Sequence, residues 1–422
     1  MTTDRSVRLG IVGVGNRGAG FAALVRSLGD VNLEVTALCD IDPGALAAAG
    51  EHFPDASRFG SLDSLLDAGA ADAVVVATPM PLHAPMSVTC LEHGVHVLCE
   101  VPAAVSVDEA CGLVASAGAS TAVYAMAENY VFSTPNRMVR ALAHAGCFGT
   151  IYWARGAYLH ELRELNETTP WRRRWQTGVP GITYPTHSIG PLLDWIGGDR
   201  ITKIACAGSG SHHIDPRGEP YHDDSATLLG RLSSGGLVEI RLDMVSDRPH
   251  AMDQYELQGT DGAYECPRGG EGRVWLRELD PQPRWRSLAE TFEAVSATRG
   301  LPPLEAVPED AGHGGGDYFV LRDFLTAIRE RREPAANVHR ALDMTLPGLV
   351  SSRALETESW VDVPDSRSWE NEEPPTKLEM VWPAGLEPPA VHLPDGYELG
   401  LLRPEERGLY VELMQRAGFD DW

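Results

Sequence analysis

The sequence has little positive charge and lacks the cysteine spacing of a metal centre. Its 422 residues carry 35 Lys and Arg against 60 Asp and Glu, a formal net charge of −25. This balance argues against a nucleic-acid backbone or an anionic membrane surface as a partner. The seven cysteines are scattered and form no C-x-x-C pair. We therefore expect reduced, mostly buried thiols and no metal site.

Long apolar segments are missing as well. No run is long enough to span a bilayer, and the opening residues, MTTDRSVRLG, contain no apolar signal-peptide core. We expect a cytoplasmic protein with no membrane partner. The chain has no internal repeat or low-complexity run, and its length exceeds one ordinary core, which predicts two domains and a tail.

A glycine-rich turn near the N-terminus is the strongest local motif. An apolar run ending at Val12 meets a G-x-G-x-x-G turn, an amphipathic helix and a second apolar run that closes on Asp40. Such a turn brings backbone and a helix N-terminus close to a pyrophosphate, and an acid at this spacing accepts ribose hydroxyls but repels a 2′-phosphate. The pattern predicts NAD binding, the alternative being a glycine turn in an α/β domain without a ligand. The expected contacts are Gly13, Gly15, Asn16, Arg17, Gly18 and Asp40.

Strands and helices continue to alternate as far as residue 127. This predicts an α/β fold, a doubly wound parallel Rossmann sheet over residues 1–127 with ligands at the carboxyl ends of its strands. Three short segments fall at such ends and are expected to face the nicotinamide half of the cofactor. They contain Thr78, Pro79, Glu100, Val101, Glu128 and Asn129.

The pattern changes near residue 128. Alternating strands joined by glycine-containing turns predict an α+β domain with a mostly antiparallel open sheet over residues 128–364. Residues 365–392 are rich in Pro and Glu and are expected to form an extended linker. Residues 393–422 resemble the first strand and helix of a GNAT acetyltransferase domain, and we assign that segment no catalysis.

Residues 1–364 resemble the Gfo/Idh/MocA oxidoreductase family. The resemblance is carried by the glycine turn, Asp40, the segment Ala77–Pro79 with His83, and the segment His93–Pro102. It adds His83 to the expected cofactor contacts. Sugar dehydrogenases of this family have a lysine where this chain has Val101. They also have two aspartates near the second-domain histidine, where this chain has Thr183 and Gly190.

Four motifs, together with these departures, resemble the NAD-dependent glycosidase branch typified by α-N-acetylgalactosaminidase. The resemblance implies a redox-neutral reaction on a small sugar or glycoside. NAD transiently oxidises C3, the C2 proton becomes acidic, the leaving group is eliminated, water adds, and the hydride returns. The motifs are Met126–Asn129, Tyr158–Arg163, Tyr184–Pro191 and His313–Asp317.

The resemblance also implies roles for single residues. His187 and Tyr184 would manage the C3 proton, and Tyr158 would be the C2 base or its orienting partner. Tyr158 could instead be a packed aromatic of an alternating strand. Glu128 would bind sugar hydroxyls or the nicotinamide ribose. Further sugar contacts are expected at His160, Arg163, Trp171 and His313.

Two other functions stay open at this stage. One is an NAD-dependent sugar or inositol dehydrogenase with His187 alone as the base, and the other is a non-catalytic sugar or NAD sensor. The histidines and aspartates of residues 211–224 fit a solvated loop better than a metal site. The resemblance further implies a homo-oligomer, a dimer or tetramer.

Overall fold

A computed structural model describes residues 6–28, 32–249, 251–308 and 311–371. The segment predicted to resemble an acetyltransferase and most of the predicted linker lie outside these residues. At the start of that linker range, the described part forms a short 3-10 helix, η4 (Ser366–Asn371), in place of extended chain. Arg367 in η4 donates two hydrogen bonds, each of 2.9 Å, to the buried carboxylate of Asp343.

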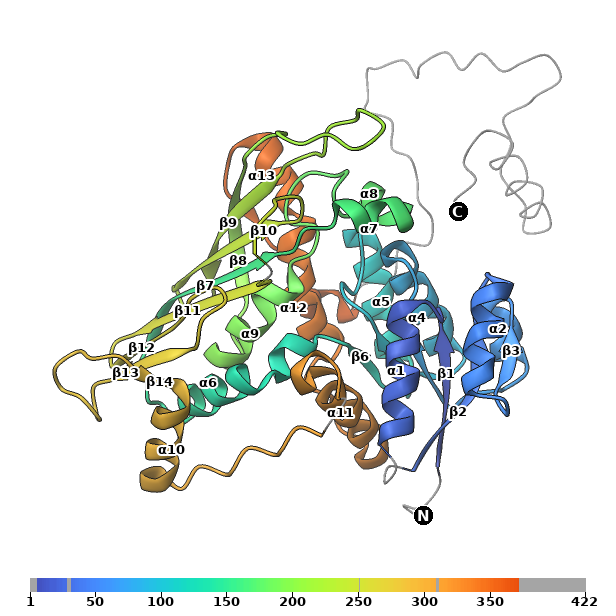
Figure 1. The fold of residues 1–422 in the computed structure, drawn as a ribbon, viewed down its shortest axis with the longest axis horizontal. Coiled ribbons are helices and arrows are strands. Elements are labelled where there is room, and N and C mark those ends of the chain that lie inside the picture. The colour runs from blue at the N-terminus through green and yellow to red at the C-terminus, as the bar shows by residue number, and fades with distance from the viewer. Residues whose placement is uncertain (1–5, 29–31, 250, 309–310, 372–422) are drawn as a thin grey trace. The chain divides into compact units, whose positions relative to one another are not determined.

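The N-terminal part is a six-stranded parallel sheet in the order β3-β2-β1-β4-β5-β6, which confirms the predicted Rossmann fold (Figure 1). Its central strands β1 and β4 are mostly buried and apolar, because helices cover both faces of the sheet. The strands are β1 (Val7–Val12), β2 (Leu33–Cys39), β3 (Ser57–Phe59), β4 (Ala73–Val76), β5 (His96–Cys99) and β6 (Tyr124–Met126). The helices are α1 (Asn16–Ser27), α2 (Pro43–His52), α3 (Leu62–Asp67), η1 (Met80–Leu82), α4 (His83–Glu92) and α5 (Val107–Ala119).

The second part is built on a nine-stranded sheet in the order β14-β13-β12-β11-β7-β10-β9-β8-β15. All its neighbours are antiparallel except β7 and β10, which confirms the predicted mostly antiparallel sheet. Its strands are β7 (Ile151–Leu159), β8 (Ile201–Gly208), β9 (Ser225–Leu232), β10 (Leu237–Asp243), β11 (Asp253–Gly259), β12 (Gly262–Cys266), β13 (Arg273–Leu276), β14 (Arg286–Ser287) and β15 (Val361–Asp362).

The helices of this second part lie between the two sheets and at their edges (Figure 1). Helix α9 packs closely on β7 because Gly156 has no side chain to separate it from the carbonyl of Ser188. The helices are η2 (Asn129–Phe132), α6 (Thr134–His144), α7 (Arg163–Thr168), α8 (Pro170–Trp175), α9 (Thr186–Ile196), α10 (Leu288–Arg299), η3 (His313–Gly315), α11 (Gly316–Glu330), α12 (Val338–Leu349) and α13 (Ser351–Thr357).

Helix α11 connects the two parts of the fold. Its buried residues Val320, Leu321 and Phe324 share one apolar core with β1 and with Phe21 of α1. The chain therefore returns from the second sheet and covers part of one face of the first. Among the described residues, no helix has the length and apolar character needed to cross a membrane.

Candidate active site

The glycine turn has the geometry that a dinucleotide requires. Gly13 has φ +85°, and a Cβ there would lie 2.7 Å from the carbonyl oxygen of Ala77. Gly18 leaves no room for a Cβ beside the carbonyl of Gly13. A Cβ on Gly15, in contrast, would meet no atom within 4 Å. The turn is therefore tightly packed at Gly13 and Gly18 and open at Gly15, at the N-terminus of α1.

Asp40 is held at the end of β2 with its carboxylate fixed. The backbone N–H of Val14 donates to Oδ2 at 2.8 Å and that of Asp42 to Oδ1 at 2.9 Å. At the end of β4, the hydroxyl of Thr78 is buried without a hydrogen-bond partner among the described residues. The open turn, the fixed carboxylate and this unsatisfied hydroxyl together fit NAD.

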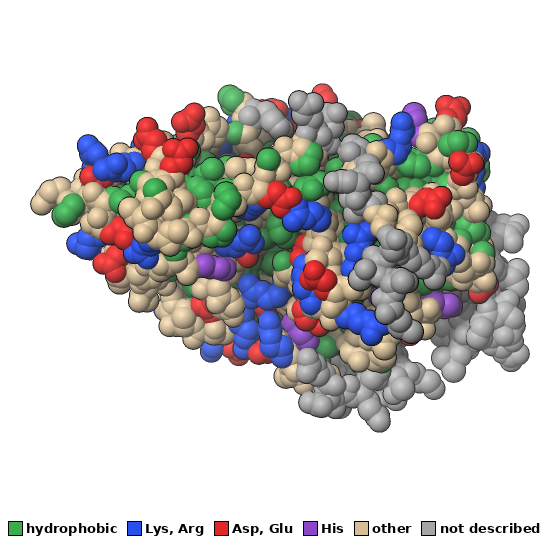
Figure 2. All heavy atoms as spheres, turned by 90° about the horizontal axis from the view of Figure 1, so that it is seen from below, with side chains coloured by type: hydrophobic (Ala, Val, Ile, Leu, Met, Phe, Trp, Pro, Cys, Tyr) green, Lys and Arg blue, Asp and Glu red, His purple; other side chains and the backbone are tan. Residues whose placement is uncertain are grey.

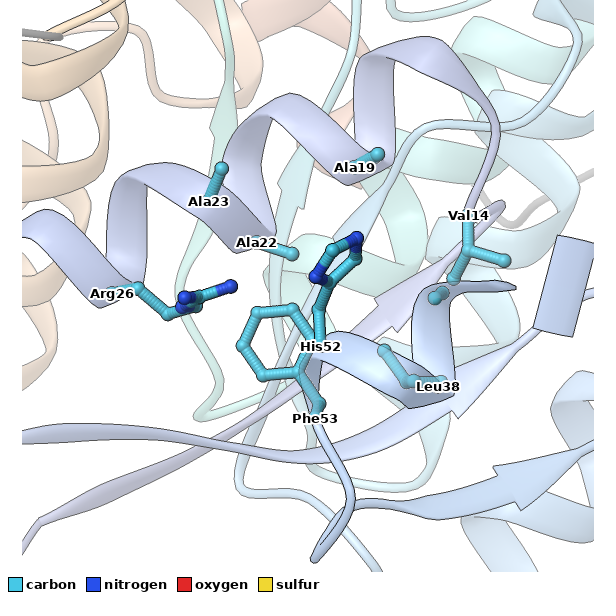
Figure 3. Close-up of a pocket in the computed structure, with 10 residues that line it drawn as sticks. Val14, Ala19, Ala22, Ala23, Arg26, Leu38, His52 and Phe53 are labelled. Atoms are coloured by element: carbon cyan, nitrogen blue, oxygen red, sulfur yellow. The ribbon is translucent and has the colours of Figure 1, made fainter. Parts of the chain in front are cut away.

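A separate cavity of about 300 Å³ lies between α1 and α2 (Figure 3). Alanines of α1 and the side chain of Leu38 line it, and Figure 3 shows His52, Phe53 and Arg26 beside it. None of its lining residues is acidic, and only Val14 and Gly18 belong to the glycine turn. We assign this cavity no ligand.

Arg17 ties the glycine turn to α11. Its guanidinium donates from Nε to Glu100 at 2.6 Å and from the two terminal nitrogens to Asp317 at 2.8 and 2.7 Å. His313 Nδ1 and Asn129 Nδ2 also donate to Asp317, each at 2.8 Å. The guanidinium of Arg17 and the side chains of Asn129 and His313, which the sequence assigned to ligand binding, thus meet in one ion-pair network.

The network stabilises the charged form of both main partners. Burial lowers the pKa of Arg17, but the charge of Glu100 and the bonds to Asp317 outweigh it and raise that pKa above its ordinary value. Burial likewise raises the pKa of Asp317, but its bonds from Arg17 and His313 outweigh this effect. The net pKa of that carboxyl is well below the usual range.

His83 supports two of the loops that end the parallel strands. It is buried, with Nδ1 2.8 Å from the carbonyl oxygen of Pro102 and Nε2 2.9 Å from that of Thr78. Burial lowers its pKa, against the two backbone hydrogen bonds. His83 therefore holds the Thr78 loop against the loop that contains Val101.

The second-domain histidine is paired with a carboxylate from the segment that follows β6. Nδ1 of His187, at the start of α9, donates to the Glu128 carboxylate, with Oε1 at 2.9 Å and Oε2 at 3.1 Å. Glu128 is completely buried, and its Oε1 also accepts the N–H of Tyr130 at 3.1 Å. A Cβ on Gly190 would lie 2.9 Å from Cγ of Glu128. Glycine at position 190 therefore provides the space that this carboxylate occupies.

Three tyrosines surround the imidazole of His187. The ring centroid of Tyr130 lies 4.2 Å from it, that of Tyr184 5.0 Å and that of Tyr158 5.1 Å. Burial raises the pKa of each tyrosine above the ordinary value. The structure thus brings together His187, Tyr184, Tyr158 and Glu128, as the resemblance implied. Tyr130 was missed, although its position directly after Glu128 and Asn129 was a usable signal.

His160 and Arg172 border the same cluster. The hydroxyl of Tyr158 lies 2.9 Å from Nδ1 of His160. The charge of Arg172, in α8, lowers the pKa of Tyr158 and of Tyr184 against the larger effect of burial. Its Nε is buried without a partner among the described residues, and its guanidinium carbon lies 4.4 Å from the ring of Trp171. The sequence analysis predicted Trp171 as a sugar contact and did not single out Arg172.

Two other predicted clusters are held by ion pairs. Arg163 donates to Glu161 at 2.9 Å and also pairs with Asp247. In the loop 211–224, His213 pairs with Asp224 at 2.7 Å. Within the described part of the chain, no group of three or more His, Cys, Asp or Glu side chains is arranged to hold a metal ion.

Comparison with known proteins agrees with this geometry. Residues 7–128 match the model of the oxidoreductase family with an NAD-binding Rossmann fold, and residues 135–370 match the C-terminal domain of glycosyl hydrolase 109. Among solved structures, an oxidoreductase domain protein from Kribbella flavida has a TM-score of 0.72 at 22% identity over 85% of this chain and 100% of its own. A levoglucosan dehydrogenase in complex with NADH and L-sorbose has a TM-score of 0.71 at 22% identity, over 86% of this chain and 100% of its own. At this identity, the likeness establishes the fold.

Relatives with curated names include glycosyl hydrolase family 109 proteins. A glycosyl hydrolase family 109 protein of Saccharopolyspora erythraea is 31% identical over 391 residues, covering 85% of this chain and 83% of its own. An alpha-N-acetylgalactosaminidase of Shewanella oneidensis is 26% identical over 418 residues, covering 87% of each chain. This chain is an NAD-dependent enzyme that belongs to glycosyl hydrolase family 109.

Proposed function

We propose that the enzyme cleaves a small glycoside by a redox-neutral route, through transient oxidation at C3 and loss of the C2 proton. The observation that carries the proposal is the buried pair of His187 and Glu128 inside an enclosure of tyrosines, next to the Rossmann strand ends. Val101 at the dehydrogenase lysine position and the name of the Shewanella relative, an alpha-N-acetylgalactosaminidase, support it. We propose an N-acetylgalactosaminide or a related glycoside as the substrate.

His187 is the group that handles the C3 hydroxyl proton. Because Nδ1 donates to Glu128 at 2.9 Å, the neutral imidazole keeps its lone pair on Nε2, which can accept a proton. When bound, NAD would supply the acceptor for the C3 hydride and the donor that returns it. The imidazole returns the same proton in the reverse direction, and Tyr184, whose ring centroid lies 5.0 Å away, flanks this exchange.

Tyr158 and His160 handle the C2 proton. A ketone at C3 makes the C2–H acidic enough for an ordinary side chain to remove its proton. Burial raises the pKa of Tyr158, so its phenol is neutral at pH 7 and can take a C2 proton only while it passes its own to His160. The hydroxyl lies 2.9 Å from Nδ1 of His160, within reach of such a transfer.

One assay separates this proposal from its rivals. Purified protein with NAD is incubated with 4-nitrophenyl α- and β-glycosides in D₂O, and aglycone and NADH are followed together. Aglycone release without net NADH, and with deuterium at C2 of the product, supports the redox-neutral route. NADH accumulation in step with sugar oxidation, without aglycone, shows a dehydrogenase instead. NAD binding without either product favours a sensor.

We also propose a cytoplasmic homo-oligomer, a dimer or tetramer. The described cysteines are free thiols, which agrees with a reducing compartment. The oligomer rests on the family resemblance and is taken up below with its test.

A further inference from the structure

A second carboxylate lies in the aromatic site and has no place in the mechanism above. Asp253 opens β11 and stands directly opposite Tyr158 of β7 in the antiparallel register. Directly opposed residues of an antiparallel pair point to the same face of the sheet. Two residues on, Tyr255 is also on this face, and its hydroxyl donates to the carbonyl of His187 at 2.5 Å. Asp253 therefore faces α9 at the end of the sheet where His187 lies.

No described Lys, Arg or His side chain forms an ion pair with Asp253. The residue is only partly exposed, and no described side chain donates a hydrogen bond to its carboxyl. Burial raises its pKa, while its own backbone N–H and the field of His187 lower it. In turn, the charge of Asp253 raises the pKa of Tyr130 and of Tyr158, in agreement with its place opposite Tyr158 in the register.

A desolvated carboxylate without a donor is costly, and a ligand that brings a donor removes that cost. Asp253 stands opposite Tyr158, and the rings of Tyr158 and Tyr130, whose centroids are 6.1 Å apart, offer apolar faces against which a sugar ring can pack. We propose that Asp253 is a substrate-binding residue that accepts a hydrogen bond from a hydroxyl or ammonium group of the glycoside and excludes sugars with a carboxylate there. This inference rests on the proposed function only in taking the ligand to be a glycoside.

The test uses the full chain loaded with NAD and three substrates, the 4-nitrophenyl α-glycosides of N-acetylgalactosamine, galactosamine and galacturonate. The variants are D253N, D253R and, as a matched control, E256Q. Glu256 is on the same strand but on the opposite face, where it pairs with Arg155 at 3.5 Å. D253N should lower kcat/KM for the neutral glycoside roughly 10- to 100-fold, mainly through KM, and E256Q should stay within about twofold.

The charge of the sugar separates the two kinds of donor. A larger loss in D253N for the galactosaminide than for the N-acetylgalactosaminide identifies an ammonium as the partner, and an equal loss identifies a hydroxyl. D253R should raise the preference for the galacturonide over the neutral glycoside at least tenfold. A purely structural role for Asp253 would not produce that gain.

Binding of the free sugars, measured by isothermal titration, keeps this inference separate from the reaction. If no glycoside is cleaved but D253N still weakens sugar binding and E256Q does not, the proposed reaction fails and the role of Asp253 stands. If D253N binds and turns over every sugar as the wild type does, the role of Asp253 is wrong. Wild-type protein that binds galacturonate as tightly as the neutral sugars also overturns it.

Discussion

The carboxylate of Glu128 fills the space that a side chain at position 190 would need. Related sugar dehydrogenases, by the resemblance, have an aspartate at this position of the helix, whereas here the acid comes from the end of β6. The carboxylate partner of His187 is therefore on another element than α9. The pair explains how a glycine three residues after His187 is compatible with an active site.

This packing makes Gly190 a sensitive position. In Gly190→Ala, the added methyl would approach Cγ of Glu128 to 2.9 Å, so Glu128 must shift and its bond to His187 weakens. We expect kcat to fall at least about tenfold and the free energy of unfolding to fall by about 1–3 kcal/mol, the usual cost of overpacking. Steady-state kinetics and thermal denaturation measure both. Gly112→Ala on α5, where a Cβ meets no atom within 4 Å, is the control and should leave both unchanged.

The orienting bond itself is tested by Glu128→Gln. Glutamine keeps the size of the side chain but accepts more weakly and can present an N–H to Nδ1, which favours the wrong imidazole tautomer. We expect kcat to fall about 10²- to 10⁴-fold, the usual range for a general base, with little change in NAD affinity. His187→Ala should lose as much. Equal activity in Glu128→Gln and wild type would show that the pair has no role in proton transfer.

Asp40 gives a prediction about the cofactor. Asp40→Ala removes the acceptor for the ribose hydroxyls and for the N–H of Val14, and it removes the charge that repels a 2′-phosphate. We expect NAD to bind at least about tenfold more weakly, which is about 1.4 kcal/mol, and the preference over NADP to shrink. Fluorescence titration with both cofactors measures this. Asp42→Ala is the control: it loses only the N-cap of α2 and should retain both affinities. An unchanged NAD affinity in Asp40→Ala would contradict the ribose assignment.

At the scale of elements, local sequence signals were sufficient to predict the strands and helices of the Rossmann domain. They were insufficient to predict the contacts between the two domains. Glycine spacing and apolar runs predicted β1, α1 and β2, because those signals act within about 35 residues. Local patterns offer no reason to pair Arg17 with Asp317, since those residues are 300 positions apart and only the return of α11 brings them together. Asp253 was missed because strand register, which no local pattern specifies, places it opposite Tyr158.

The contact between α1 and α11 has a predictable acid dependence. Because the folded pKa of Asp317 is depressed, its carboxylate stabilises the fold fully above the ordinary aspartate value of about 3.9 and loses that contribution as the pH falls toward the folded value. Asp317→Asn should therefore lower the free energy of unfolding by about 2 kcal/mol at pH 7. The difference from wild type should shrink below pH 4.

Thermal denaturation from pH 3 to 8 tests this pH dependence. Asp323→Asn is the control. Asp323 also lies in α11 and pairs with the exposed Arg332, so this variant should lose less stability than Asp317→Asn at pH 7. A constant difference between Asp317→Asn and wild type across the range would show that the carboxylate charge is not the source of the stability.

At the scale of the whole molecule, one face of the nine-stranded sheet is the surface to consider. On the face turned away from α9, Leu229 is 46% exposed and stands beside Ala205 on the next strand. Arg155 pairs with Glu239 at 3.2 Å on this same face. Figure 2 shows acidic and basic side chains mixed on the side seen from below. A sheet face with apolar side chains among paired charges is suited to contact a second copy of the chain.

The resemblance-based expectation of a homo-oligomer can be tested on this face. Light scattering after gel filtration should give a mass that is two or four times the 45.7 kDa of one chain. Leu229→Glu places a charge that has no partner in the contact and should reduce the mass to that of a monomer, because burying such a charge costs several kcal/mol. Tyr152→Glu is the control, since it places the same charge at a residue that is similarly exposed, at 50%, near the start of β7, where the register with β11 shifts. Dissociation by Tyr152→Glu and not by Leu229→Glu would place the contact elsewhere, and a monomeric wild type would show that the family's association does not extend to this chain.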